Sequence, residues 1–327
     1  MINFFRKLLY EKTKPIILAN PKKIRLIKRN SKKIYYIIKR DRWHGMFSNL
    51  HYVLLHVIYS KKKNYIPIVD MENFPTIYNE KNKINNTFNS WNYYFQKYSY
   101  KKLDYIYKNK NIKFSDNSKL DTSKINKKYY KKYKKILKDN LINKSIIRHT
   151  NLFERKFFKN KKVIGIHFRG SDQKTAALHP FPPTFQQVNE ILKKKISLDK
   201  SEIIFLATEE QKIWDKFKNI YGSRIIGYKS FRSNKDIFSY YPRRKHRYLL
   251  GYENIINMIL LSKVDYLIHS NTNFSAMAIH YSKKKIKQSI IFNGFNSKNI
   301  FLANILWYLK SLLPMGLGGF ISNVKNK

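Results

Sequence analysis

The sequence predicts an α/β fold whose second half forms a doubly wound parallel sheet. From about Lys161 onward, short apolar runs alternate with amphipathic stretches about five times. The short runs are almost continuously apolar, which is typical of strands that helices cover on both faces. Together these two patterns indicate a parallel sheet with helices on either side.

The elements of this half can be read in chain order. The expected strands are KVIGIHF, EIIFLAT, SRIIGY, DYLIHS and QSIIFN. The expected helices are TFQQVNEILKKKI, EEQKIWDKFKNIYG, GYENIINMILLSKV and NFSAMAIHYSKK. Thr184 has the position and side chain of an N-cap for the first helix, and Gly222 closes the second.

The first half contains one further β-α-β unit. The stretch KKIYYIIKRD reads as a strand, a helix follows from about Gly45 to Lys63, and YIPIVD reads as the next strand. Residues 71–100 hold turns and aromatic side chains, and residues 101–145 become helical toward their end. With the boundary near 146–161, we divide the chain into domains at 1–155 and 156–298 and a C-terminal helix and tail at 299–327.

The C-terminal stretch IFLANILWYLKSLLPMGLGGF is close to the length that spans a membrane. Its apolar residues recur at helical spacing up to Pro314, which favours a helix packed on a protein core over a spanning one. These residues are Leu302, Ile305, Leu306, Leu309, Leu312 and Leu313. The N-terminal stretch MINFFRKLLYEKTKPIIL lacks the apolar core of a secretory signal. The chain has no Cys, which fits a reducing compartment, so we expect a cytoplasmic protein.

The net charge of +47, from 67 Lys and Arg against 20 Asp and Glu, has three explanations. A Lys-, Asn- and Ile-rich composition alone would produce it, and we favour this explanation because the lysines form scattered pairs and triplets. Attraction to an anionic membrane surface is the second explanation and suits a protein at the inner face of the membrane. Nucleic-acid binding is the third and is disfavoured, because no recognition motif accompanies the charge.

The segment VIGIHFRGSD places charged residues at the end of a buried strand. Ligands of open parallel sheets bind beyond the carboxyl ends of the strands. Alternation puts His167 and Arg169 on one face there, and Gly170 allows a sharp turn or a close approach. The guanidinium of Arg169 matches phosphate oxygens and keeps its charge. An ordinary surface pair of Arg169 and Asp172 is the alternative.

The segment SNTNFSAMA follows the buried strand DYLIHS and opens a helix. Its polar side chains and the first N–H groups of that helix attract anions. One of these residues also serves as the N-cap, which is the structural alternative for the whole group.

Four blocks of this sequence resemble the GDP-fucose-dependent fucosyltransferases of the core α1,6 and nodulation type. The blocks are IGIHFRGSD, AALHP, IFLATEE and LLSKVDYLIHSNTNFSAMA, and they follow in the order of that family. In the first half, GMFSNLHYVL and YIPIVDMENFPTIYNE are also similar to members of the family. The resemblance implies a GT-B fold, in which two Rossmann-like domains face a cleft. The first domain would then bind the acceptor, the second the nucleotide sugar, and the C-terminal helix would pack back toward the first.

The resemblance also implies roles for individual residues. Arg169 would hold the β-phosphate of the donor, which gains charge as the glycosidic bond breaks. His167 and Asp172 would shape that site, while Glu209 and Glu210 would accept hydrogen bonds from the ribose or from Arg169. The polar loop would hold phosphates through Ser270, Thr272, Asn273 and Ser275.

Two positions depart from the family pattern. Asn257 stands where many relatives have an Asp that reads the guanine edge, so the nucleotide base stays open. No acidic residue lies between Asp172 and Glu190, where relatives often carry a Glu as general base. Imidazoles exchange protons near neutral pH, so His179 is one candidate base, with a carboxylate of the first domain as another. A purely structural role for His179 before Pro180 also fits.

In the first domain, the segment RWHGMFSNLH offers further polar groups. His44 and Asn49 suit hydrogen bonding to a sugar, and Trp43 suits stacking, although core packing is an equal interpretation of the Trp. No His residues stand with carboxylates at metal-ligand spacing, so we expect a reaction without metal or other cofactor.

The sequence therefore predicts an inverting glycosyltransferase that transfers fucose from GDP-fucose to a glycan hydroxyl. The expected partners are a nucleotide sugar and a glycan acceptor, with an anionic membrane surface as a further candidate; the oligomeric state is left open. A basic nucleic-acid-binding protein and a catalytically degenerate sugar-binding GT-B fold are the alternatives.

Overall fold

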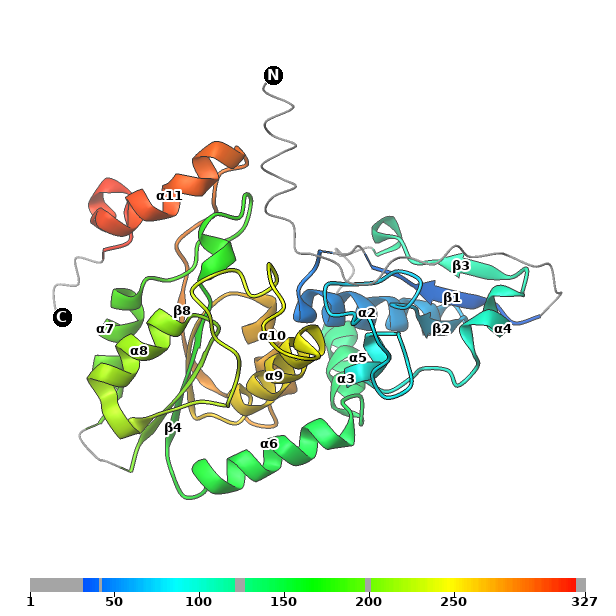
Figure 1. The fold of residues 1–327 in the computed structure, drawn as a ribbon, viewed down its shortest axis with the longest axis horizontal. Coiled ribbons are helices and arrows are strands. Elements are labelled where there is room, and N and C mark those ends of the chain that lie inside the picture. The colour runs from blue at the N-terminus through cyan, green and yellow to red at the C-terminus, as the bar shows by residue number, and fades with distance from the viewer. Residues whose placement is uncertain (1–31, 41–42, 121–126, 198–200, 322–327) are drawn as a thin grey trace. The chain divides into compact units, whose positions relative to one another are not determined.

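A computed structural model describes residues 32–40, 43–120, 127–197 and 201–321 of the chain, without the side chains of Lys119, Lys127, Lys128, Tyr129, Ser171 and Asp172. It divides into two compact units (Figure 1). The first unit holds the chain up to Arg148 together with Phe238–Asn254, and the second holds His149–Ile237 and Ile255–Lys327. The chain therefore returns to the first unit for one short segment.

The first unit is built on a three-stranded parallel sheet in the order β2-β1-β3. The predicted β-α-β unit is confirmed, whereas the strand β3 was not predicted. Tyr36 of β1 donates a hydrogen bond to His56 of α2 over 2.8 Å in one tautomer, which ties the helix to the sheet. The elements of this unit are β1 (Tyr35–Ile38), α2 (Met46–Lys62), β2 (Ile66–Val69), α3 (Trp91–Tyr94), α4 (Leu103–Tyr107), β3 (Ile112–Phe114) and α5 (Lys127–Lys138).

The segment that returns to the first unit packs on an aromatic cluster there. The rings of Tyr94 and Tyr248 stack at 5.7 Å with 8° between their planes, and the Tyr94 hydroxyl donates to the Tyr248 carbonyl. The Tyr248 N–H donates in turn to the buried carboxylate of Glu80 over 3.0 Å. This segment is therefore an integral part of the first unit's core.

The second unit contains a five-stranded sheet in the order β6-β5-β4-β7-β8, with every pair parallel. This order confirms the predicted doubly wound α/β fold. The boundary between the units falls inside α6 and α9. The elements of this part are α6 (Lys144–Phe157), β4 (Val163–Phe168), α7 (Phe185–Lys195), β5 (Ile203–Thr208), α8 (Gln211–Tyr221), β6 (Ile225–Ile226), α9 (His246–Leu261), β7 (Tyr266–Ser270), α10 (Asn273–Tyr281), β8 (Lys287–Ile291) and α11 (Ile300–Leu312).

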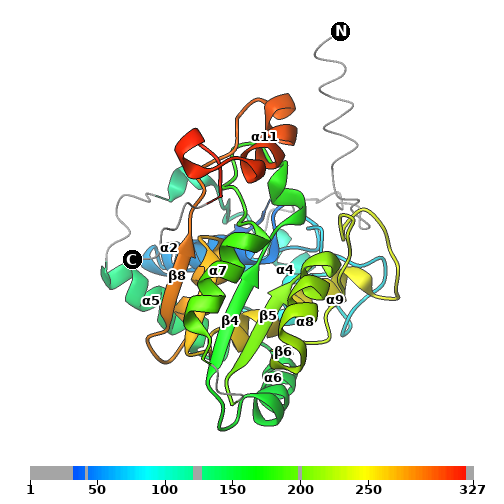
Figure 2. The same ribbon diagram turned by 90° about the vertical axis from the view of Figure 1, so that its left-hand side faces the viewer.

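Helices cover both faces of this sheet, as Figures 1 and 2 show. α7 and α8 pack on one face against alternate residues of the central strand β4, among them Ile164 and Ile166. The other alternate residues, Gly165 and His167, face α9 and α10. A Cβ at Gly165 would lie 2.9 Å from atoms of Leu261 and Val264, so only Gly allows α9 to end this close to the strand. The predicted caps of Thr184 and Gly222 are both present, with φ +54° at Gly222.

The C-terminal helix α11 differs from the prediction in what its apolar stripe contacts. We expected the stripe to face a core, but Leu302, Ile305, Leu309 and Leu312 are 47%, 50%, 53% and 75% exposed. Ala303 is the residue of α11 that the second unit buries. The helix is held instead by Trp307, whose indole N–H donates to the Pro182 carbonyl over 3.0 Å.

Among the helices that the structure describes, none combines the length and the apolar character that crossing a bilayer requires.

Candidate functional site

The carboxyl edge of the five-stranded sheet gathers most of the predicted site residues of the second unit. Because all five strands run parallel, the residues after β4, β5 and β7 emerge at the same edge. Arg169 follows β4, Glu209 and Glu210 follow β5, and Ser270 ends β7. The sequence placed these residues on separate blocks, and the sheet topology brings the blocks together.

His167 is the next-to-last residue of the strand β4 and lies against the start of α10. Its side chain is 4% exposed and its ring stacks on Phe274, with the centroids 4.2 Å apart and 20° between the planes. Nδ1 lies 3.5 Å from Oγ1 of Thr272. Burial is the main cause that lowers the pKa of His167 well below its usual range, and the neighbouring Arg169 and His269 lower it further. His167 is therefore a neutral ring that fixes the strand end to the helix start.

Replacing His167 by Asn should make the free energy of unfolding decrease less steeply as the pH falls. The unfolded chain takes up the proton near pH 6.5, whereas the folded protein resists it until far lower pH. The contribution of His167 to the free energy of unfolding is therefore fully present above about pH 6.5. It decreases by up to about 1.4 kcal/mol per pH unit as the pH falls toward the pKa of the folded protein. Urea unfolding at pH 7.5, 6.5 and 5.5 measures this slope. The control is His149→Asn at an exposed position, which should leave this pH dependence unchanged. An unchanged slope in the His167 variant would contradict the prediction.

Arg169 and Gly170 stand directly after the strand. Arg169 is half-buried, and its charge reaches the ring of His167. A Cβ at Gly170 would lie 1.5 Å from Oε1 of Glu210, so the Glu210 carboxylate occupies the space that any other residue would fill. That carboxylate binds the ammonium of Lys174 through both oxygens, at 3.1 and 3.0 Å. Gly170 thus permits an ion pair that joins the end of β5 to the turn after β4.

The start of α10 presents main-chain donors at the same edge. Thr272 caps the helix and forms a reciprocal capping box with Ser275, whose hydroxyl also donates to the Ser270 carbonyl over 2.8 Å. Asn273 is the first helical residue and is exposed. The N–H groups of a helix start attract anions. Thr272 and Ser275 are occupied in the cap, so the atoms available to a ligand here are mainly those of the main chain and of Asn273.

Among the buried polar atoms of the second unit, two that have no hydrogen-bond partner within the described residues belong to predicted site residues. They are Oγ of Ser270, in a residue 3% exposed, and Oδ1 of Asn257, in a residue 7% exposed. The amide nitrogen of Asn257 donates to the Ser230 hydroxyl over 2.9 Å. An unpaired buried polar atom costs free energy, so such atoms mark places where a ligand or water restores a bond.

The loop that carries Ser230 forms a small platform beside Asn257. The guanidinium of Arg232 lies 3.8 Å from the centroid of the Trp214 ring and donates to the Tyr228 carbonyl over 3.1 Å. A planar cation stacked on an indole is a surface on which a flat base can pack. Ser230 and Arg232 were not predicted as site residues, although the position of KSFRS after a predicted strand was a signal for them.

His179 lies farther along the same edge, beside the end of β8. Its carbonyl accepts a hydrogen bond from the Asn296 N–H over 2.8 Å, and its side chain is exposed. Asp172 belongs to a short 3-10 turn, Ser171–Lys174, but its side chain lies outside the described part of the structure. Glu209 is half-buried, and its carbonyl accepts from the Ser233 N–H over 2.9 Å. The catalytic assignments of His179 and Asp172 stay predictions.

His44 and Asn49 belong to the first unit, at the start of α2. The Asn49 amide donates to the His44 carbonyl over 3.0 Å, and Asn49 is 3% exposed. Its Oδ1 has no partner among the described residues and its side chain lines a cavity of about 10 Å³ with Thr76 and Ser90. That volume suits a single water molecule. The sugar-binding role predicted for both residues stays a prediction.

No protein-family profile matches this chain, and no curated protein resembles it in sequence. Among the solved structures with a similar fold are several fucosyltransferases. NodZ from Bradyrhizobium is 13% identical, with 76% of this chain and 92% of that chain covered and a TM-score of 0.46. FUT1 from Arabidopsis thaliana, in complex with GDP, is 11% identical, with 79% and 70% covered and a TM-score of 0.48. POFUT1 in complex with GDP-fucose is 10% identical, with 80% and 98% covered and a TM-score of 0.48.

Proposed function

We propose that this protein is a glycosyltransferase that uses a GDP-linked sugar, with fucose as the sugar transferred, and a glycan hydroxyl as acceptor. One observation carries the proposal. At the carboxyl edge of a doubly wound sheet, Arg169 stands at the end of β4, beside the start of α10 and the unpaired Ser270 hydroxyl at the end of β7. A fixed cation, helix N–H groups and a hydroxyl together suit a diphosphate.

The proposed reaction is a single in-line displacement. A base removes the proton from the acceptor hydroxyl as its oxygen attacks the anomeric carbon, and the bond between that carbon and the β-phosphate oxygen breaks. The diphosphate leaves with an added negative charge, which Arg169 and the start of α10 stabilise. One displacement inverts the anomeric carbon. His179 is our candidate for the base because it stands exposed at the same edge of the sheet.

The donor's base would lie on the platform next to Asn257. The stacked Arg232 and Trp214 offer a flat surface, and Oδ1 of Asn257 offers one acceptor for a base N–H. A carboxylate would accept two hydrogen bonds from guanine, whereas the amide oxygen of Asn257 accepts one. We therefore expect the preference for GDP over other nucleotides to be smaller than with an Asp at this position. The cationic groups already present supply the leaving group's counter-charge, and we propose that the reaction needs no divalent ion.

Thermal-shift measurements with GDP, UDP, ADP and CMP test the proposal. At about 100 times its Kd a ligand stabilises the folded protein by about 2.7 kcal/mol, so GDP should raise the midpoint by several degrees. Arg169→Ala should abolish this shift, while Arg155→Ala, which removes an exposed charge from α6, should keep it. A GDP shift of equal size in wild type and Arg169→Ala, or no preference among the nucleotides, would refute the assignment.

A further inference from the structure

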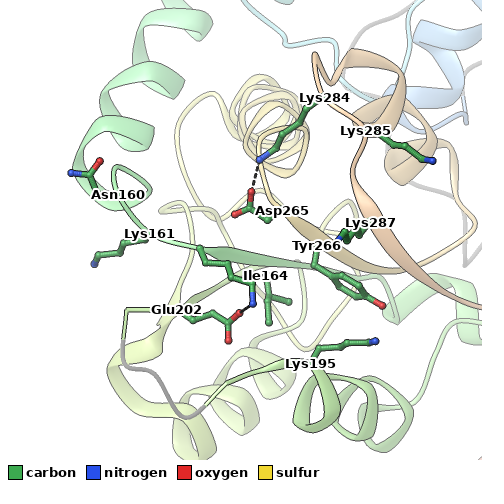
Figure 3. Close-up of a pocket in the computed structure, with 11 residues that line it drawn as sticks. Asn160, Lys161, Ile164, Lys195, Glu202, Asp265, Tyr266, Lys284, Lys285 and Lys287 are labelled. Atoms are coloured by element: carbon green, nitrogen blue, oxygen red, sulfur yellow. Dashed lines mark hydrogen bonds and ion pairs between the residues drawn. The ribbon is translucent and has the colours of Figure 1, made fainter.

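A cavity of the second unit lies at the amino edge of the five-stranded sheet, at the opposite end of the strands from Arg169. It has a volume of about 780 Å³ and opens to solvent (Figure 3). Its wall is made by residues that precede β4, β5, β7 and β8 or begin those strands, together with the end of α7. We call this cavity the lysine basin, because six of its eleven lining residues are Lys161, Lys162, Lys195, Lys284, Lys285 and Lys287.

Two carboxylates line the basin, and both are already engaged. Asp265 accepts from the Val163 N–H over 2.9 Å and pairs with Lys284 over 2.6 Å. Glu202 accepts from the Ser197 N–H over 2.6 Å and pairs with Lys162 over 2.6 Å. Each carboxylate therefore supports the main chain and pairs with one lysine, and Glu202 also lies 3.7 Å from the guanidinium of Arg224, so neither compensates the rest of the basin.

The other four lysines have no carboxylate partner within the described ranges. Lys161, Lys285 and Lys287 are exposed, and Lys195 has its ammonium 5.3 Å from the centroid of the Tyr266 ring. Lys287 is the register partner of Tyr266 on the neighbouring strand, so Lys195 and Lys287 flank one aromatic ring, as Figure 3 shows. The Tyr266 hydroxyl lies 2.6 Å from Oγ of Ser289, which fixes the ring as part of the floor.

Helix dipoles explain only part of this charge. Lysines are favoured near helix C-termini, and this edge of the sheet is where the helices end. Lys195 stands in the last turn of α7 and fits that explanation. Lys161, Lys162 and Lys287 instead precede or begin strands, and Lys284 and Lys285 come after α10 has ended. Helix dipoles therefore do not account for the lysines at the strand starts.

We propose that the lysine basin is a second binding site, for a small anion that carries several phosphate groups. The volume lies in the range of small-ligand pockets, and a sphere of that volume is about 11 Å across, close to the Debye length at physiological salt. Several of these lysines can therefore act on the same ligand, with Lys195 and Lys287 beside the Tyr266 ring. A bounded cavity with one aromatic ring in its floor favours a compact polyphosphate over an extended nucleic-acid strand, which needs a groove with several stacking rings. The inference does not depend on the proposed transferase activity.

Calorimetric titration with inorganic tripolyphosphate at 150 mM salt tests this site. With GDP added at saturation to occupy the proposed nucleotide site, wild type should bind one tripolyphosphate, and a variant with Lys161, Lys195, Lys285 and Lys287 all replaced by Gln should bind at least tenfold more weakly. The matched control removes the same charge from the first unit by replacing the exposed Lys61, Lys62, Lys63 and Lys81 by Gln, and should bind within twofold of wild type. Arg169→Ala should also bind tripolyphosphate like wild type, which separates this site from the proposed nucleotide site.

Vesicles distinguish a soluble ligand from a lipid headgroup. Vesicles of phosphatidylcholine with and without phosphatidylinositol bisphosphate are pelleted with the same variants. If the basin variant alone no longer pellets with the bisphosphate vesicles, the result supports a lipid headgroup as the source of the phosphate groups. Equal weakening of both probes in the basin variant and the matched control would overturn the proposal, because net charge would then account for the binding. Tighter binding of a single-stranded RNA than of either probe, with equal loss in both lysine variants, would overturn it as well.

Discussion

Replacing Arg169 by Ala should lower the rate constant of sugar transfer about 10²- to 10³-fold, because the leaving diphosphate loses its fixed cation. The fold should survive, since Arg169 is half-buried at the end of a strand whose core residues are unchanged. The measurement is the release of GDP from GDP-fucose with a panel of glycan acceptors, at saturating donor. The thermal midpoint without ligand serves as the check on folding.

Two further variants make this result specific. Arg169→Lys keeps the charge but loses the planar fork, so it should recover part of the rate and leave a deficit of about tenfold or more. Arg155→Ala should transfer at the wild-type rate. An Ala variant that keeps its rate within a few-fold of wild type would mean that another cation stabilises the leaving group, or that the reaction is a different one.

Gly170→Ala should destabilise the protein by about 2–3 kcal/mol, since the new methyl group must displace the Glu210 carboxylate. Glu210 is 8% exposed, and its movement would separate it from Lys174, whose side chain is 16% exposed. Overpacking and a weakened, partly buried ion pair both contribute to the cost. For a protein of this size we expect the thermal midpoint to fall by roughly 4–12 °C.

A double variant identifies the cause of that loss. If the Glu210 carboxylate is what the methyl group meets, Gly170→Ala should cost much less in a protein that already carries Glu210→Ala. Gly316→Ala is the control, because no atom lies within 4 Å of a Cβ built there, and it should shift the midpoint by little. Additive losses in the double variant would show that the strain at Gly170 has another source.

The sequence was informative where local patterns decide the structure. Apolar runs bounded by Gly and polar residues located all five strands of the second sheet, because a strand covered on both faces needs side chains such as those of Ile204 and Leu206. The capping box at Thr184 and the positive φ at Gly222 follow from the residue types at those positions. Residues after parallel strands converge by topology alone, which is why Arg169 and Ser270 were predicted to share an edge.

Local sequence patterns do not predict contacts between segments that are distant in the chain. The pairing of Lys174 with Glu210 depends on the space that Gly170 leaves, and the bond between Asn257 and Ser230 depends on the path of a loop. The strand Ile112–Phe114 is short and carries a Lys, so its sequence shows no clear strand pattern. Its pairing with β1 is what makes it a strand. The stripe on α11 has the spacing of a core-facing helix, and spacing alone does not reveal that the stripe is exposed.

The return of Phe238–Asn254 to the first unit affects how the chain folds while it is being synthesised. The aromatic cluster around Tyr94 is incomplete until Tyr248 has left the ribosome, although the rest of that unit has emerged by Arg148. At typical elongation rates of about 5–20 residues per second, roughly 5–20 s separate those two events. The nascent protein therefore holds an unfinished hydrophobic core during that interval, and a fragment released at Arg148 would lack the segment that closes it.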